Sequence, residues 1–92
     1  MNGSVFLDTN ILVYANDSAA PEKQHTARTL IKDTLRAENG VISVQVLSEF
    51  WVTVTRKIRK PLSLSTARRQ AELFALMTVV DLDVALFYDA LR

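Results

Sequence analysis

Three short apolar runs, each followed by a segment of helical pattern, constrain the fold of this chain more than any other feature. The runs are Val5–Leu7, Val41–Ile42 and Thr78–Val80. Each is too short for a helix and suits a buried strand. Because strands and helices alternate along the chain, the sequence predicts an α/β fold with a short parallel sheet flanked by helices.

The first helical segments begin and end at residues typical of helix boundaries. "ILVYA" follows Asp8, Thr9 and Asn10, which are turn and N-cap residue types. Pro21 suits the first turn of the next helix, which is amphipathic, and Gly40 is its expected C-terminal cap residue.

The segment that starts at Val44 gives conflicting signals. Its valine and threonine content favours a strand. Its large apolar residues nevertheless repeat at helical spacing: Leu47, Phe50, Trp51, Val54 and Ile58. We therefore expect Ser43 to cap a helix that runs from Val44 to about Lys57.

Two more helices are expected in the last third of the chain. Ser65 would cap one, and Asp81 or Asp83 would cap an amphipathic helix whose pattern is still running at Arg92. A natural domain rarely stops in the middle of such a helix. We therefore expect residues 1–92 to form a single, incomplete domain that lacks its last helix–strand elements.

Composition excludes several classes of protein. The 92 residues include no cysteine, which excludes a disulfide framework and thiolate metal sites. A net charge of +1 neither favours nor excludes a nucleic-acid partner. The chain shows no signal peptide and no apolar stretch long enough to span a bilayer, so we expect a cytoplasmic protein without a membrane partner.

Asp8 is the first candidate functional residue, because a charge directly follows an apolar strand. Ligands of open α/β sheets bind beyond the carboxyl ends of the strands, and a carboxylate there suits Mg²⁺ or Mn²⁺. The alternative is a simple turn or cap residue. An aspartyl-nucleophile phosphatase is not supported, because Asn10 stands where its second acid would be.

Glu49 is the second candidate, because it lies within the apolar stretch "VQVLSEFWV". An ionised carboxylate buried there would cost several kcal/mol unless a cation or hydrogen-bond donors met it. In the alternative, Glu49 points outward, since it falls opposite the stripe that contains Phe50 and Trp51.

The stretches "VFLDTNILVYA" and "VISVQVLSEFWVTVTRK" resemble the PIN-domain ribonucleases, in particular the VapC-type toxins of type II toxin–antitoxin pairs. The resemblance implies a three-layer PIN-like fold and metal-dependent cleavage of RNA. It also implies that Asp8 and Glu49 are catalytic, metal-binding acids and that Thr9 and Asn10 support the site. A homodimer and a cognate antitoxin partner are implied in the same way.

The chain departs from the family pattern in its acids. Members of the family carry a third acid on a later helix and often a fourth. Asp89 in "LFYDALR" comes too soon after the third strand, and we interpret it as a solvated helix residue. Two acids bind a divalent ion weakly, so the 92-residue chain is expected to be poorly active or inactive.

These features leave three functions open: a toxin ribonuclease, a non-toxin PIN nuclease in RNA processing, and a non-catalytic binding or dimerisation module. The basic residues of "RKIRK" bear on the choice, because they are candidates for contact with RNA phosphates: Arg56, Lys57, Arg59 and Lys60. The alternative for this run is a solvated helix end, where cations are favourable.

Overall fold

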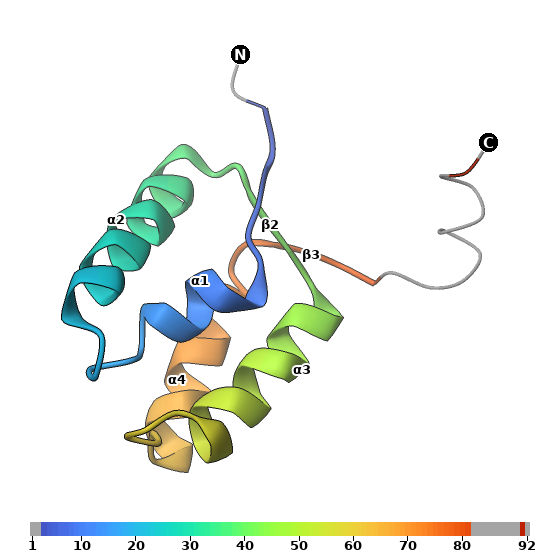
Figure 1. Ribbon diagram of the computed structural model, residues 1–92. Helices are drawn as coiled ribbons and strands as arrows, with labels where there is room; N and C mark the ends of the chain where they lie inside the picture. Colours follow the sequence, from blue (N-terminus) through green and yellow to red (C-terminus); the bar gives the residue numbers. More distant parts are fainter. Residues whose placement is uncertain (1–2, 82–90, 92) are drawn as a thin grey trace.

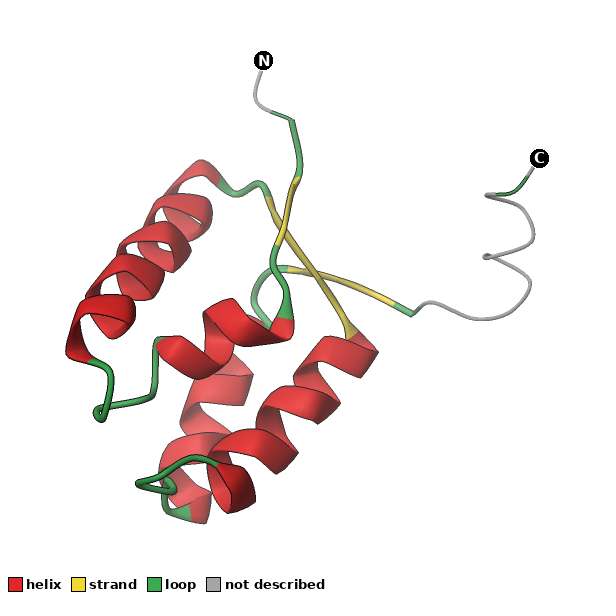
Figure 2. Cartoon of the chain, in the orientation of Figure 1, coloured by secondary structure: helices red, strands yellow, loops and turns green. Residues whose placement is uncertain are grey.

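The computed structural model describes residues 3–81 and residue 91, and within them a three-stranded sheet is flanked by helices (Figures 1 and 2). The elements, in chain order, are β1 (Val5–Phe6), α1 (Thr9–Tyr14), α2 (Pro21–Ala37), β2 (Gly40–Ser43), α3 (Val44–Val52), η1 (Thr53–Lys57), α4 (Leu64–Phe74) and β3 (Thr78–Val80). The predicted α/β fold with a short parallel sheet is therefore confirmed. The last expected helix, with Asp83 and Asp89, lies outside the described residues. None of the described helices is long and apolar enough to cross a membrane.

The sheet has the strand order β1-β2-β3, and both pairs of neighbouring strands are parallel. Val5 pairs with Gly40 across β1 and β2, and Ser43 pairs with Val80 across β2 and β3. The carboxyl ends of parallel strands meet at one edge of a sheet. In Figure 1, β1 leads into α1 and β2 leads into α3 at this edge, so the first turns of the two helices are brought together.

Strand β1 is less buried than its apolar sequence predicts. Leu7 is 5% exposed, whereas Phe6 is 75% exposed. Successive side chains of a strand point to opposite faces of the sheet, so only alternate residues face the helices. The prediction of a run buried throughout Val5–Leu7 is wrong for Phe6.

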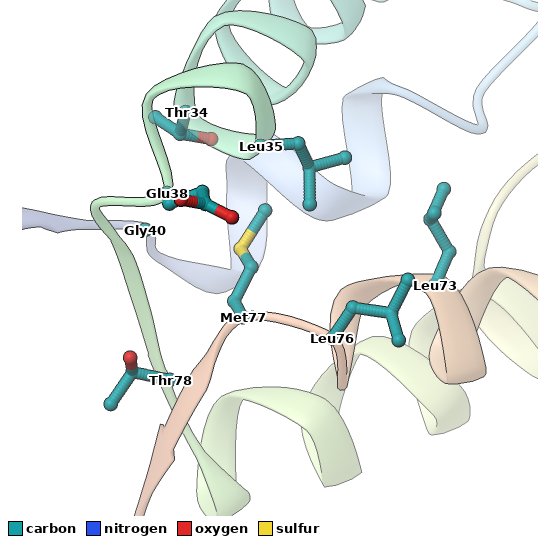
Figure 3. A pocket seen from close by; sticks show the side chains of 8 residues that line it. All are labelled: Thr34, Leu35, Glu38, Gly40, Leu73, Leu76, Met77 and Thr78. Carbon is teal, nitrogen blue, oxygen red and sulfur yellow. The ribbon is translucent and has the colours of Figure 1, made fainter.

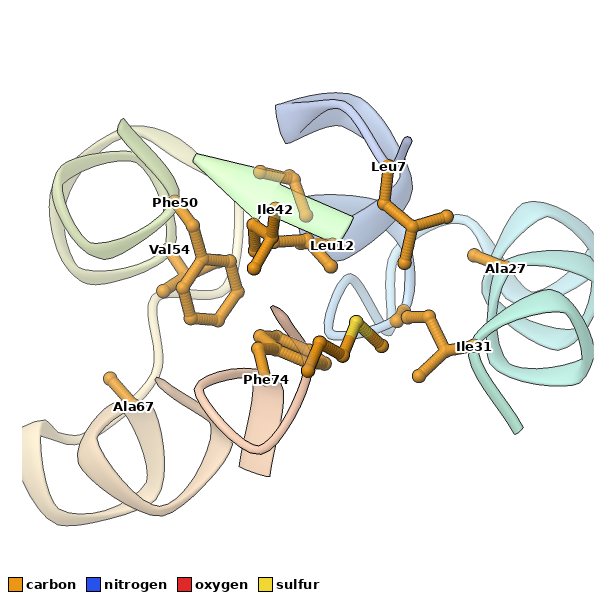
Figure 4. Packing of buried hydrophobic residues seen from close by; sticks show 12 residues of the cluster. Leu7, Leu12, Ala27, Ile31, Ile42, Phe50, Val54, Ala67 and Phe74 are labelled. Atoms are coloured by element: carbon orange, nitrogen blue, oxygen red, sulfur yellow. The ribbon is translucent and has the colours of Figure 1, made fainter. Parts of the chain in front are cut away.

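The core lies between the sheet and the helices, and its largest side chains come from α3 and α4 (Figure 4). Phe50 and Phe74 are fully buried, and their rings meet edge to face with centroids 5.1 Å apart. Apolar residues that share one helical face, such as Ala67 and Phe74 on α4, explain why these helices pack inward.

The helices that follow β1 and β2 both begin with a side-chain cap, as the sequence predicts. The Asp8 Oδ1 accepts a 3.1 Å hydrogen bond from the Ile11 backbone N–H, and the Ser43 Oγ accepts one of 3.0 Å from Val46. The expected cap at Ser65 is wrong. Ser63 caps α4 instead, by accepting from the Thr66 N–H.

The end of α2 also differs from expectation. Its C-terminal cap is Glu38, which has a left-handed backbone with φ of 54°, and not Gly40. Gly40 is the first residue of β2, where it is buried against Met77. A Cβ at Gly40 would lie 2.9 Å from the Met77 Sδ, so close packing rather than backbone freedom explains the glycine.

The helix from Val44 reaches Lys57 as predicted, but it does not remain an α-helix. Its last turn, Thr53–Lys57, is a π-helix, in which the Ile58 N–H donates to the Thr53 carbonyl at 3.1 Å. A π turn inserts one residue into the helical repeat and often occurs near functional sites.

Candidate functional site

A hydrogen bond joins the two candidate segments at the carboxyl edge of the sheet. The Thr9 Oγ1 donates to the Glu49 Oε2 at 2.8 Å, although the residues are forty positions apart in the sequence. Thr9 is the first residue of α1, which follows β1 after two residues, and Glu49 lies on α3, which follows β2. The parallel pairing of the two strands is what brings these helices into contact.

The Glu49 carboxylate has a second partner on its own helix. The Gln45 Nε2 donates to the Glu49 Oε1 at 3.2 Å, so each carboxylate oxygen accepts one hydrogen bond. Glu49 is exposed, and of the two orientations left open by the sequence it is the outward one that is observed. Its position is therefore set by two neutral donors, with no cost of burying a charge.

Asp8 is exposed at the same edge, one residue before Thr9. Its Oδ1 is used by the cap of α1, and this geometry matches the simpler interpretation of the residue. A carboxylate has further acceptor capacity beyond one hydrogen bond, so capping does not prevent it from binding a cation. Asn10 is also exposed, on the first turn of α1, and takes no part in the hydrogen bonds that link Thr9, Glu49 and Gln45.

An open groove of about 450 Å³ runs from Glu49 along α3 and η1. Its lining residues are Thr9, Ser48, Glu49, Val52, Thr53 and Lys57. The four predicted RNA-contact residues are all exposed, but only Lys57 lines this groove. The others lie outside it: Arg56, Arg59 and Lys60.

A larger hollow, of about 530 Å³, lies elsewhere (Figure 3). It is lined by residues at the start of β2 and before β3, among them Gly40 and Met77, and by Glu38 at the end of α2. These positions are the amino ends of the strands, whereas ligands of open α/β sheets bind at the carboxyl ends. The groove beside Glu49 is therefore the better candidate for a functional site.

The candidate metal ligands at this edge are the carboxylate oxygens of Asp8 and Glu49 and the hydroxyl of Thr9. Such a set fits Mg²⁺ or Mn²⁺ and not a metal that prefers thiolate or imidazole. Within residues 3–81 and 91, no group of three or more acids, histidines or cysteines is close enough to hold a metal ion. Asp8 and Glu49 are exposed and could each give carboxylate oxygens to an ion that water molecules also coordinate.

Two polar residues beside Glu49 were missed by reasoning from the sequence, Gln45 and Thr53. Ser48, which also lines the groove, lies in the Ser-Glu-Phe stretch that carries the family resemblance, but no site role was expected for it. A signal for Gln45 and Thr53 is present, because Gln45, Glu49, Thr53 and Lys57 recur every fourth residue. Residues at this spacing share a helical face. The apolar stripe on the opposite face is the stronger pattern in this stretch, and it does not predict a role for the polar row.

Comparison with family models matches residues 5–92 to the model described as the PIN domain. Comparison with curated proteins and with solved structures gives no match. PIN domains are in general nucleases that depend on divalent metal ions and act on RNA, which agrees with acids and hydroxyls gathered at the carboxyl edge of a parallel sheet. From the match over nearly all of its length, the chain belongs to the PIN-domain family.

Proposed function

We propose that this PIN-domain protein is a metal-dependent endoribonuclease and the VapC-type toxin component of a type II toxin–antitoxin system. The observation that carries the nuclease proposal is the hydrogen bond from Thr9 to Glu49 at the carboxyl edge of the sheet. It joins the two sequence motifs of the family into one exposed site.

In this proposal Asp8 and Glu49 are the catalytic acids that hold Mg²⁺ or Mn²⁺. The ion would neutralise charge on the phosphate and make a bound water more acidic. The hydrogen bonds from Thr9 and Gln45 hold the Glu49 carboxylate in one orientation, so the carboxylate is preorganised for metal binding. Asn10, adjacent on α1, supports the site from the solvent side.

The substrate in this proposal is RNA, and the basic residues Arg56, Lys57, Arg59 and Lys60 contact its phosphates. All four are exposed near the end of the helix that carries Glu49. Cations at this position attract a polyanion and hold it next to the acids.

The toxin role, a cognate antitoxin, a homodimer and a cytoplasmic location are proposed from the resemblance of the two motifs to VapC-type toxins. A small antitoxin gene next to the gene for this chain would support the toxin role. A PIN nuclease of RNA processing is the alternative, and it would lack that neighbour.

Substitution of the acids tests the nuclease function. Asn is as good an N-cap residue as Asp, so Asp8→Asn should retain α1 while it removes the charge. The 92-residue chain is expected to cleave slowly, so the assay uses a high protein concentration and a long incubation. We expect Asp8→Asn and Glu49→Gln each to lower this slow cleavage of a labelled RNA in Mn²⁺ by about a further hundredfold, because a lost metal ligand removes several kcal/mol of transition-state stabilisation.

Asp33→Asn is the matched control, because Asp33 is exposed on α2 and does not line the groove beside Glu49. It should cleave RNA as the parent chain does. Unchanged cleavage by Asp8→Asn would overturn the assignment of Asp8. Parent protein that neither cleaves RNA nor binds Mn²⁺ in a titration would favour the third possibility, a non-catalytic binding or dimerisation module.

A further inference from the structure

The groove beside Glu49 is lined by a row of polar side chains, with Val52 beside them, along a single continuous helix. Glu49, Thr53 and Lys57 all line it, each four residues after the last. Thr9 and Ser48 add hydroxyl groups at the end near Glu49. The groove therefore has an acid at one end, a cation at the other and hydroxyls between them.

The π turn explains why Glu49, Thr53 and Lys57 line the same side of the helix. An α-helix has 3.6 residues per turn, so the four-residue step from Glu49 to Thr53 rotates roughly 40° past a full turn. A π turn has more residues per turn, because its hydrogen bond spans five residues, so the four-residue step from Thr53 to Lys57 rotates by less than a full turn. Lys57 is thus rotated back toward the line of Glu49.

The charge on Lys57 is available to a ligand. In the part of the chain that the structure describes, the one ion pair joins Arg68 to Glu72 on α4. Lys57 is exposed and lines a groove whose other side chains, apart from Glu49, are uncharged. A lysine ammonium group in such a position is a good point-charge ligand for phosphate.

We propose that this groove is a phosphate subsite, in which Lys57 binds a backbone phosphate of single-stranded RNA next to the phosphate held at Asp8 and Glu49. The inference deepens the proposed nuclease function and rests on it. It distinguishes Lys57 from Arg56, Arg59 and Lys60, which lie outside the groove. The hydroxyl of Thr53, halfway along the groove, is placed to donate to the same sugar–phosphate backbone.

Binding without cleavage tests this subsite. The full chain is titrated with a fluorescent single-stranded RNA in EDTA, which prevents cleavage, at several KCl concentrations. We expect Lys57→Gln to weaken binding about three- to tenfold and to reduce the slope of log K against log [KCl] by about 0.7, the value for one lost phosphate contact on a single strand. Lys57→Arg should restore both values.

Lys32→Gln is the matched control, because it removes the same ammonium charge from an exposed residue on α2, outside the groove and apart from the proposed RNA contacts. It should change affinity less than twofold. Equal losses from Lys57→Gln and Lys32→Gln, or no loss from either, would overturn the subsite. Circular dichroism of both variants establishes that the fold is retained.

The two proposals fail in different ways. Cleavage that depends on Asp8, with binding that is insensitive to Lys57, removes the subsite and leaves the nuclease function. Binding that depends on Lys57, without cleavage in Mn²⁺, removes the nuclease function and leaves a groove that binds RNA. A parent chain that does not bind the RNA overturns the subsite outright.

Discussion

Thr9 donates a 2.8 Å hydrogen bond to Glu49, and this bond links the first turn of α1 to α3. The threonine is the residue that follows Asp8, so the bond also relates the two proposed metal ligands. Its donor is a neutral hydroxyl, which orients the carboxylate and leaves its charge in place.

Removal of this hydroxyl should weaken metal binding without unfolding the protein. Thr9→Val keeps the shape of the side chain but cannot donate to Glu49. We expect about a 10- to 100-fold loss in Mn²⁺ affinity by calorimetry, as is typical when a partner of a metal ligand is lost. Thr9→Ser keeps the donor and should stay close to the parent. Equal affinity in Thr9→Val and Thr9→Ser would show that the bond does not position Glu49.

The aromatic pair of the core should show coupled contributions to stability. Phe50 and Phe74 are fully buried, with an angle of 81° between their rings. We expect Phe50→Leu and Phe74→Leu each to lower the free energy of unfolding by about 1–2 kcal/mol. A double-mutant cycle from urea denaturation should give about 0.5–1.5 kcal/mol of coupling between the rings. Strict additivity would contradict an edge-to-face interaction.

Gly40 should not tolerate a methyl group. An added Cβ would lie 2.9 Å from the Met77 Sδ and 3.3 Å from its Cγ, so the methionine would have to move within the core (Figure 3). We expect Gly40→Ala to lower the free energy of unfolding by about 1 kcal/mol or more, measured by urea denaturation. Gly3→Ala is the control, because no atom lies within 4 Å of its Cβ position, and it should change stability by less than about 0.5 kcal/mol.

Glu38 should be improved by glycine. Its φ of 54° at the C-terminal cap of α2 is unfavourable for a residue with a Cβ. We expect Glu38→Gly to raise the free energy of unfolding by about 0.5–1 kcal/mol and to raise the melting temperature. Glu38→Ala keeps the Cβ and should give no gain. A gain of equal size in both variants would point to the lost charge instead of the backbone.

The sequence by itself determined the order of the elements, the parallel sheet and two of the helix starts. Asp8 and Ser43 were found because a cap acts within three or four residues, and short-range patterns carry that information. The positions of Asp8 after one strand and of Glu49 on the helix after the next followed from the same local patterns.

Predictions from local sequence patterns were wrong where contacts with distant residues decide between local conformations of similar energy. Gly40 looked like a helix cap, but it lies in β2 against the Met77 side chain, and Glu38 takes the left-handed position. The π turn at Thr53–Lys57 was likewise invisible in the spacing of the apolar residues.

In the candidate site, too, some features follow from the sequence and others only from the tertiary structure. The two motifs and their acids are sequence features, whereas the contact between Thr9 and Glu49 exists only because β1 and β2 pair in parallel and in one register. The groove that contains Lys57, and leaves out the three neighbouring cations, depends in turn on how α3 continues into η1. Residues forty positions apart become neighbours only when the whole chain folds, since no local interaction relates them.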